Sequence, residues 1–401
     1  MKLTERFLNY VSYPTMSDES SDTCPSTKKQ LALAAVLEAE LRGLGLTAET
    51  DENGYVYGSL PSNCGKVTPR VAFLAHMDTS DAAPDSPIKP RTLLYEGGDI
   101  ILNKEENIIM PESDTIRPFK GLHLIVTDGK TLLGADDKAG IAEIMDALER
   151  LIASGEAHGE IRVCFTPDEE IGRGTDRINM KKLDADYGYT LDGDVLGCIE
   201  DENFNAAGAT VTFSGFSVHP GSAYGKMINA SLAAFEFNAL LPADEIPAKT
   251  KDREGFIHLT DMSGEIEHAT LRYIIRDHDR AKFEEKKQKM LDAAAEINAK
   301  YGTDVVSVSI KDSYYNMKEI IDKHPEVLEG AEKAMRAMGV EPYYSPIRGG
   351  TDGARLSFEG LPCPNLCTGG NTYHSRFEFA VVEHMEKCAD IVLEMMKNTA
   401  K

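Results

Sequence analysis

The chain has 401 residues, with 66 acidic and 43 basic side chains and a formal net charge of -23. This length exceeds the roughly 100–200 residues of a typical domain, so two domains are expected. The negative charge opposes binding to nucleic acid or to an anionic membrane surface.

No run approaches the ~20 apolar residues of a membrane span, and MKLTERFLNYVSYPT lacks the apolar stretch of a signal peptide. The seven cysteines, an odd number without a CxxC pair, are typical of reduced thiols. Cys363 and Cys367 stand between prolines without the second cysteine pair of a zinc clip. These features predict a cytoplasmic protein without a membrane partner.

The first half of the chain alternates predicted helices and strands. Ser26 is expected to cap a helix whose apolar residues recur between Leu31 and Leu44, and Gly43 or Gly45 can end it. Apolar runs at 71–75, 161–166 and 187–191 predict strands, with a helical pattern at 141–152 between two of them. This βα alternation predicts an α/β fold with a mostly parallel sheet.

From about residue 206 the pattern changes. Strand-like runs at 209–213, 256–260, 269–275 and 305–310 and helical patterns at 227–241 and 280–299 follow the order βαββαβ. This order predicts an open-faced sandwich. A final helix is expected near 381–396, so we predict a catalytic domain formed by residues 1–205 and 315–401 with an inserted domain at 206–314.

Potential metal ligands follow the predicted strands of the first domain. His76, Glu169–Glu170 and Asp192 each come directly after such a run or at its end, where parallel sheets bind their ligands. Asp136 lies in a glycine-flanked turn before a helix that begins near Lys138, and His374 lies near the end of the chain. Mixed imidazole and carboxylate donors are typical of zinc sites.

The neighbours of these ligands suggest distinct roles. Asp78 can accept the second imidazole N–H of His76, and one of Glu169 and Glu170 can bind metal while the other takes a proton from a metal-bound water. Asp136–Asp137 also fits an N-cap pair, with Asp137 capping and Asp136 binding metal. Gly349–Gly350 lacks the Lys-Ser/Thr of a phosphate loop.

Ten sequence blocks carry a family resemblance over essentially the whole chain: AHMDTS, DGKTLLGADDKAG, FTPDEEIG, NFNAA, VHPG, YIIRD, DSYYNM, IRGGTDGA, LPCPNL and YHSRFEF. In this order they resemble the peptidase T family of the di-zinc aminopeptidase and carboxypeptidase superfamily. The resemblance implies a di-zinc α/β catalytic domain with an inserted lid.

The resemblance also assigns residues to roles. Two zinc ions per chain are implied, with Asp136 bridging them, His76 and Asp192 on one ion, and Glu170 and His374 on the other. Glu169 is implied as the general base and Asp78 as the residue that orients His76. Three lid or loop residues are implied to reach the substrate: His219, Arg276 and Arg348. Where the family tends to read glycine, asparagine and then the ligating histidine, this chain has GGNTYHSRFEF, so contacts beside His374 are expected to differ.

The implied reaction is removal of the N-terminal residue from a tripeptide, so the implied partner is a small peptide substrate. The resemblance leaves a homodimer open as the oligomeric state. A dipeptidase, carboxypeptidase or deacylase could use the same ligands. A noncatalytic metal-binding regulator predicts a missing base or ligand, which this chain does not show. Arg276 could instead pair with Asp277 or Asp279, and Arg348 could anchor a loop.

Overall fold

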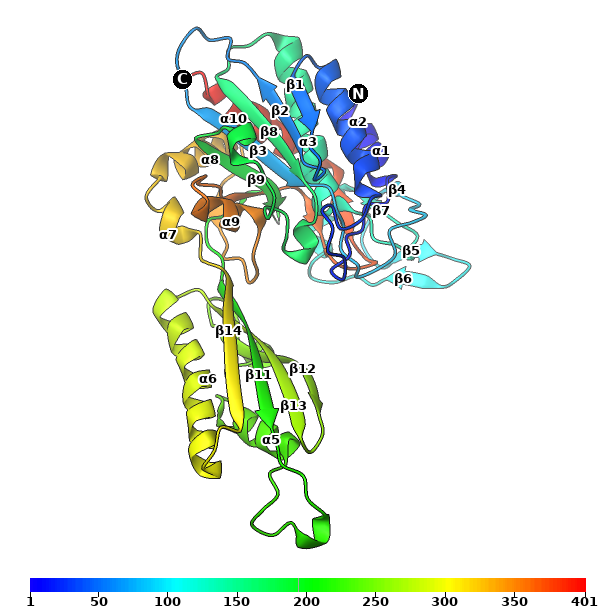
Figure 1. Cartoon of the computed structure of the whole chain (residues 1–401). Helices are drawn as coiled ribbons and strands as arrows, with labels where there is room; N and C mark the ends of the chain where they lie inside the picture. The colour runs from blue at the N-terminus through cyan, green and yellow to red at the C-terminus, as the bar shows by residue number, and fades with distance from the viewer. Residues whose placement is uncertain (194) are drawn as a thin grey trace. The chain divides into compact units, whose positions relative to one another are not determined.

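The computed structural model describes residues 1–193 and 195–401 and divides into two compact units (Figure 1). Unit 1 consists of Met1–Asp201, Glu319–Ser345 and Thr351–Lys401. Unit 2 consists of Glu202–Lys318 and Pro346–Gly350. The insertion that the sequence predicts at 206–314 lies inside the longer segment of unit 2.

Unit 1 is built on an eight-stranded sheet. In sheet order its strands are β1 (Thr47–Thr50), β2 (Val56–Leu60), β8 (Glu160–Thr166), β3 (Arg70–His76), β9 (Tyr187–Gly193), β16 (Asn365–Cys367), β10 (Cys198–Glu200) and β15 (Tyr343–Tyr344). The pairs β8–β3, β3–β9 and β9–β16 in the centre are parallel, while β2 and β10 join them in antiparallel fashion. The predicted α/β fold with a mostly parallel sheet is confirmed.

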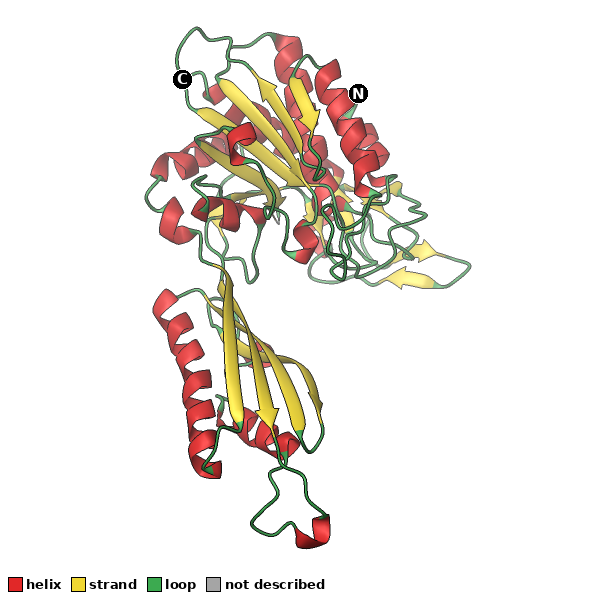
Figure 2. Cartoon of the chain, in the orientation of Figure 1, coloured by secondary structure: helices red, strands yellow, loops and turns green. Residues whose placement is uncertain are grey.

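Both faces of this sheet are covered (Figure 2). Because side chains alternate along a strand, Val71 and Phe73 of β3 join one core cluster and Ala72 and Leu74 join another. The helices that contribute to the first cluster are α1 (Leu3–Val11), α2 (Gln30–Gly43), α3 (Ala135–Ser154), α8 (Pro325–Ala337) and α10 (Val382–Asn398). The second cluster includes residues of α4 (Met180–Leu183) and α9 (Asp352–Phe358). This double cover explains the nearly continuous apolar runs of the central strands.

The predicted cap of α2 is wrong. The N-cap residue of this helix is Lys29, and no side chain caps it. The Ser26 hydroxyl instead donates to the buried carboxylate of Asp168 at 2.5 Å. A charged acceptor binds a hydroxyl more strongly than a neutral one does, so this contact takes the place of the cap.

A second, smaller sheet of unit 1 was not predicted. Its antiparallel strands are β17 (Gly370–Asn371), β18 (Phe379–Val381), β7 (His123–Val126) and β4 (Arg91–Leu94), and a separate hairpin pairs β5 (Ile100–Asn103) with β6 (Ile108–Met110). Phe379 of β18 pairs with Val126 of β7. This register brings the connection between β17 and β18 next to the chain that leaves β7.

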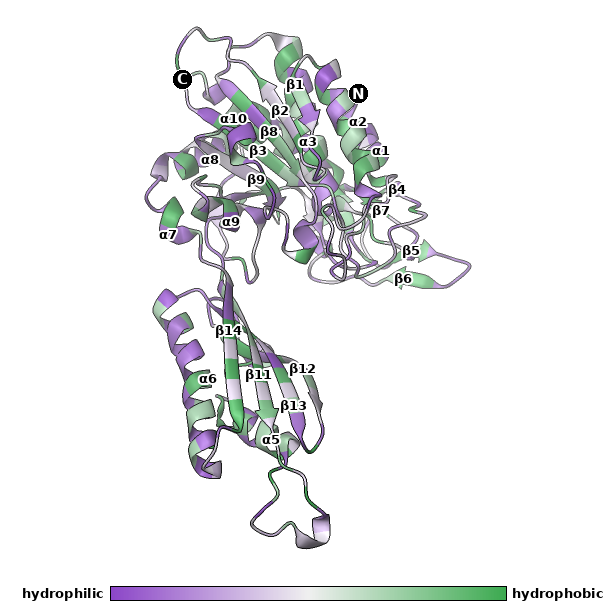
Figure 3. Cartoon of the chain, in the orientation of Figure 1, coloured by the Kyte–Doolittle hydropathy of each residue, from purple (hydrophilic) through white to green (hydrophobic). Residues whose placement is uncertain are grey.

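Unit 2 is an antiparallel sheet with two helices. The strand order is β12 (Phe256–Gly264), β13 (His268–Asp277), β11 (Asn205–Ser214) and β14 (Val306–Tyr314). Helices α5 (Ala230–Leu240) and α6 (Arg280–Tyr301) contact the sheet and each other, so they cover the same face. Along α6, apolar and polar residues alternate (Figure 3), as in a helix with one buried face. The chain order β11, α5, β12, β13, α6, β14 is that of an open-faced sandwich.

Short α7 (Lys318–Ile321) follows, and no helix in the described residues is long and apolar enough to cross a bilayer.

Candidate active site

The predicted ligands of unit 1 meet at one edge of the parallel sheet. His76 is the last residue of β3 and pairs with Thr166, the last residue of β8. Glu169 and Glu170 begin a short 3-10 turn after β8, and Asp192 lies in the last part of β9. Because β3, β8 and β9 run in the same direction, their carboxyl ends bring these groups together.

Asp136 lies between the two predicted histidine ligands. Its Oδ1 is 2.8 Å from Nε2 of His76, and its Oδ2 is 3.2 Å from Nε2 of His374. His374 Nε2 also lies 2.7 Å from Oε2 of Glu170. Burial acts to raise the pKa of Asp136, but the hydrogen bonds from His374 and His76 hold this pKa below its ordinary value. The carboxylate therefore presents one oxygen to each imidazole.

The potential ligand atoms form two groups that share His76. One group contains His76, Asp136 and Glu170, and the other contains His76, Glu169 and Asp192. Within each group the atoms lie within 4.8 Å of one another. Nε2 of His76 is 3.4 Å from Oδ1 of Asp192. The structure thus brings all five predicted metal ligands and Glu169 into one cluster.

The local backbone explains the direction of Asp136. Asp136 and Asp137 have non-helical backbone angles at the start of α3, so the regular helix begins after them. Oδ1 of Asp137 accepts the N–H of Gly140 at 3.2 Å, which is the N-cap contact predicted for Asp137. Its Oδ2 accepts the N–H of His76 at 3.1 Å. Asp137 therefore holds the start of α3 against the end of β3.

Asp78 contacts more than the ring that it was expected to orient. Nδ1 of His76 lies 3.1 Å from the backbone carbonyl of Asp78 and 3.4 Å from its carboxylate. The carboxylate accepts the backbone N–H groups of Glu169 at 2.9 Å and Glu170 at 3.2 Å. The N–H of Ser80 then donates to Oε1 of Glu170 at 3.0 Å. The loop after β3 is therefore joined directly to the turn that carries both glutamates.

Two buried acids near the cluster were missed by sequence reasoning. Glu378 accepts the backbone N–H groups of Leu133, Gly134 and Asp136, and Asp352 accepts the Thr166 hydroxyl at 2.7 Å. Burial raises the pKa of Glu378 to about 7 and that of Asp352 to about 6. Both acids stand inside quoted family blocks, IRGGTDGA and YHSRFEF, and Glu378 is flanked by Phe377 and Phe379, so an acid between two aromatic residues was the available signal for it.

The charge balance of the cluster fits bound cations. Burial raises the pKa of Glu170 to about 7 and that of Asp192 to about 6. For Glu169, burial followed by repulsion from Asp192 raises the pKa well above its ordinary value. Four half-buried carboxylates thus face the buried imidazole of His76 and the exposed imidazole of His374, and a charge that is partly removed from water without a partner is costly. A pair of divalent cations would offset this excess, and the imidazole and carboxylate donors suit zinc.

The three residues implied to reach the substrate all lie in unit 2. His219 is exposed, and its Nδ1 accepts the N–H of Gly221 at 3.1 Å. Nη1 of Arg276 donates to the backbone carbonyls of Ala207 and Ile275, while Asp277 pairs with Lys286. The guanidinium of Arg276 also lies over the Tyr314 ring.

Arg348 anchors a loop of unit 2. Its guanidinium donates to the carbonyl oxygens of Asp252, at 2.6 Å, and Glu254, at 3.1 Å. It also lies 5.1 Å from the centre of the Phe204 ring. These contacts match the alternative interpretation, in which Arg348 anchors a loop, and they fix its guanidinium in place.

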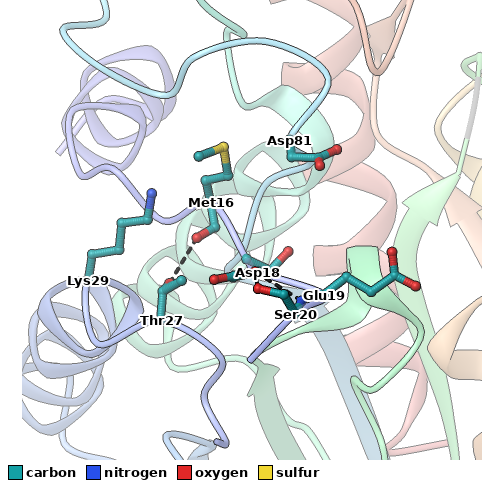
Figure 4. Close-up of a pocket in the computed structure, with 8 residues that line it drawn as sticks. Met16, Asp18, Glu19, Ser20, Thr27, Lys29 and Asp81 are labelled. Carbon is teal, nitrogen blue, oxygen red and sulfur yellow. Dashed lines mark hydrogen bonds between the residues drawn. The ribbon is translucent and has the colours of Figure 1, made fainter. Parts of the chain in front are cut away.

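A pocket lies on the surface of unit 1. It has a volume of about 790 Å³, and its lining includes Asp18, Glu19, Lys29 and Asp81 (Figure 4). Lys29 is paired with Asp85 at 2.7 Å, so the pocket rim carries an excess of negative charge. A smaller cavity of about 190 Å³ shares Glu19 and Asp81 with it and is also lined by Glu170. The smaller cavity therefore links residues of the pocket lining to one predicted metal ligand.

Comparisons with known proteins identify the family of the chain. A model of Peptidase family M20/M25/M40 matches residues 110–398. A peptidase T from Caldanaerobacter subterraneus subsp. tengcongensis is 49% identical over 401 residues, which cover 99% of this chain and 98% of the relative. A peptidase T from Clostridium botulinum (strain Loch Maree / Type A3) is 52% identical over 396 residues, which cover 98% of this chain and 97% of the relative.

A solved structure shares the fold. The crystal structure of aminopeptidase PepT from Bacillus cereus has a TM-score of 0.79 at 24% identity and covers 100% of this chain and 98% of that chain. The family resemblance seen in the ten sequence blocks is thus confirmed over the full length. The chain therefore belongs to peptidase family M20/M25/M40, within its peptidase T group, which makes it a metallopeptidase, as the motifs predict.

Proposed function

We propose that the cluster at the sheet edge is a di-zinc centre that removes the N-terminal residue from tripeptides. The observation that carries this proposal is the placement of Asp136, with one carboxylate oxygen toward His76 and the other toward His374. Such a carboxylate is suited to bridge two cations. In this proposal His76 and Asp192 complete one zinc site, and Glu170 and His374 complete the other.

The proposed chemistry assigns separate tasks to the two adjacent glutamates. Zinc, when bound, lowers the pKa of a water molecule to about 7 and polarises the scissile carbonyl. Glu169 accepts the proton of the attacking water and returns it to the leaving amine. Burial raises the pKa of Glu169, which makes its carboxylate a stronger proton acceptor. Asp78 fixes the backbone of both glutamates.

The substrate is proposed to be held at both of its charged ends. The negative rim of the pocket beside Glu170 favours the free ammonium group of a peptide. Arg276 and Arg348 are proposed to bind the C-terminal carboxylate, because a guanidinium can grip a carboxylate through two parallel hydrogen bonds. His219 is proposed to stabilise the negative charge that develops on the attacked carbonyl oxygen.

The proposal extends to the setting of the enzyme. All seven cysteines are free thiols, which supports a reducing compartment and hence the cytoplasm. A homodimer is proposed as its assembly, and light scattering on the purified protein tests this part alone.

Hydrolysis of a simple tripeptide tests the function. The zinc-loaded protein is expected to cleave it, a chelator to abolish cleavage, and added zinc to restore it. Cleavage that a chelator leaves unchanged contradicts the di-zinc proposal. Absence of cleavage by protein with a full complement of zinc supports a noncatalytic metal-binding role instead.

A further inference from the structure

Glu378 holds the turn that carries Asp136 through three hydrogen bonds. Its Oε2 accepts the N–H groups of Leu133 at 2.8 Å and Gly134 at 2.9 Å, and its Oε1 accepts the N–H of Asp136 at 3.1 Å. The side chain is almost completely buried, with 2% of its surface exposed. Both carboxylate oxygens are therefore used, and no water is needed to satisfy the three N–H groups.

The small sheet explains how residues so distant in sequence meet. Glu378 directly precedes β18, whose first residue, Phe379, pairs with Val126 of β7. The turn with Leu133 and Gly134 follows β7 along the chain. The connection between β17 and β18 also carries His374. This one short segment therefore supplies both a predicted metal ligand, His374, and the acid that binds the turn of Asp136, Glu378.

The turn needs such a support because its backbone is irregular. Gly134 has a positive φ of 81°, and Asp136 and Asp137 depart from helical angles. Regular helix hydrogen bonds therefore do not fix the direction of Asp136. The buried ammonium of Lys138 interacts electrostatically with Glu378 and offers a countercharge to it.

We propose that Glu378 is a positioning residue of the metal centre, whose carboxylate sets the direction of Asp136 between His76 and His374. This inference rests on the proposed di-zinc function. Neither conservative replacement can reproduce the contact. Glutamine has only one acceptor oxygen for three N–H groups, and aspartate is one methylene shorter.

Glu383 provides a matched control. Its carboxylate also accepts a backbone N–H from a remote segment, that of His123 at 3.0 Å, and it lies five residues after Glu378. His123 begins β7 and has no predicted ligand beside it. Glu383→Gln therefore removes the charge from a half-exposed contact between remote segments without touching the turn of Asp136.

The test compares zinc binding in the full-length wild type, Glu378→Gln and Glu383→Gln by calorimetric titration of the metal-free proteins. We expect Glu378→Gln to weaken zinc binding by about 10–100-fold, the usual effect of removing a partner of a metal ligand, and Glu383→Gln to bind as the wild type does. The cobalt(II)-loaded Glu378→Gln protein should show an altered visible spectrum. With excess zinc, its kcat for a tripeptide should fall while its KM stays near that of the wild type.

Wild-type affinity in Glu378→Gln, or equal losses in both variants, overturns the inference. If Glu378→Gln does not fold, as judged by circular dichroism, Glu378→Asp carries the same test because it keeps the buried charge but shortens the reach. A wild type that binds fewer than two zinc ions contradicts the proposed function itself. If the wild type binds two zinc ions tightly and Glu378→Gln binds them equally tightly, only the positioning role of Glu378 is contradicted.

Discussion

The carboxylate of Asp78 accepts the backbone N–H of Glu169 at 2.9 Å, and so joins the loop after β3 to the turn after β8. It also accepts the N–H of Glu170. Asp78→Asn keeps the size of the side chain but replaces one acceptor oxygen by an NH2 group. This NH2 group would face the backbone N–H of Glu169 or Glu170, so one of the two hydrogen bonds is lost. We expect kcat to fall by about 10–100-fold.

Steady-state kinetics on a tripeptide check this prediction, with zinc content measured on the same sample. Asp186→Asn, on a surface ion pair with Arg70, serves as a control and should stay near wild-type activity. A kcat of Asp78→Asn equal to that of the control contradicts the role of Asp78.

Replacement of Asp136 should lower the amount of bound zinc more than replacement of a residue that binds only one ion. We expect Asp136→Ala to lose more bound zinc than Asp192→Ala or His374→Ala, because Asp136 faces both histidines. Elemental analysis after identical purification measures this. Retention of two zinc ions per chain by Asp136→Ala rules out its bridging role.

Glu169→Gln separates proton transfer from metal binding. The change keeps size and hydrogen bonding but removes the carboxylate that accepts the proton. Zinc should remain bound, and kcat should fall by about 10²–10⁴-fold. A loss of less than about tenfold argues against Glu169 as the base. Zinc loss as large as in Glu170→Gln places Glu169 among the metal ligands.

Arg276 and Arg348 should distinguish tripeptide acids from tripeptide amides. Losing a hydrogen bond to a charged group costs about 1.5–3 kcal/mol, so Arg276→Ala should weaken kcat/KM for the acid by about 10–100-fold. The amide lacks the charge and should hardly change. Arg348→Ala should also loosen the loop that it anchors at Asp252 and Glu254. If neither change narrows the preference for the acid, substrate length is selected by the shape of the lid.

Zinc binding should release protons. Hydrogen bonds that His374 donates to the carboxylates of Asp136 and Glu170 raise its pKa to about 10, so its imidazole is protonated at neutral pH in the metal-free protein. A metal ligand must lose this proton, so zinc affinity should rise with pH up to about that pKa and fall as the pH decreases. Titrations in two buffers of different ionisation enthalpy measure the protons released. Equal heats in both buffers contradict the prediction.

The sequence predicts the structural features that depend on a local pattern of residues. The strands that end at His76 and Thr166 follow from apolar runs, and the parallel order places their ends at one edge. The cap of α3 by Asp137 likewise involves a residue only three positions away. Such features need no knowledge of distant segments.

The contacts that were missed join segments far apart in the sequence. Glu378 and Leu133 are 245 residues apart, and Ser26 and Asp168 are 142 apart. The strands of the small sheet that bring Glu378 to its turn are two to four residues long, too short for a periodic signal. The acid in YHSRFEF could be noticed, but its partners could not be read from the sequence.

The most direct test of the proposed function is identification of the products from a tripeptide with three different residues, using protein whose metal content is measured on the same sample. We expect the free N-terminal residue and the remaining dipeptide, formed by protein with two zinc ions per chain. Release of the C-terminal residue, or the same products from metal-free protein, would contradict it.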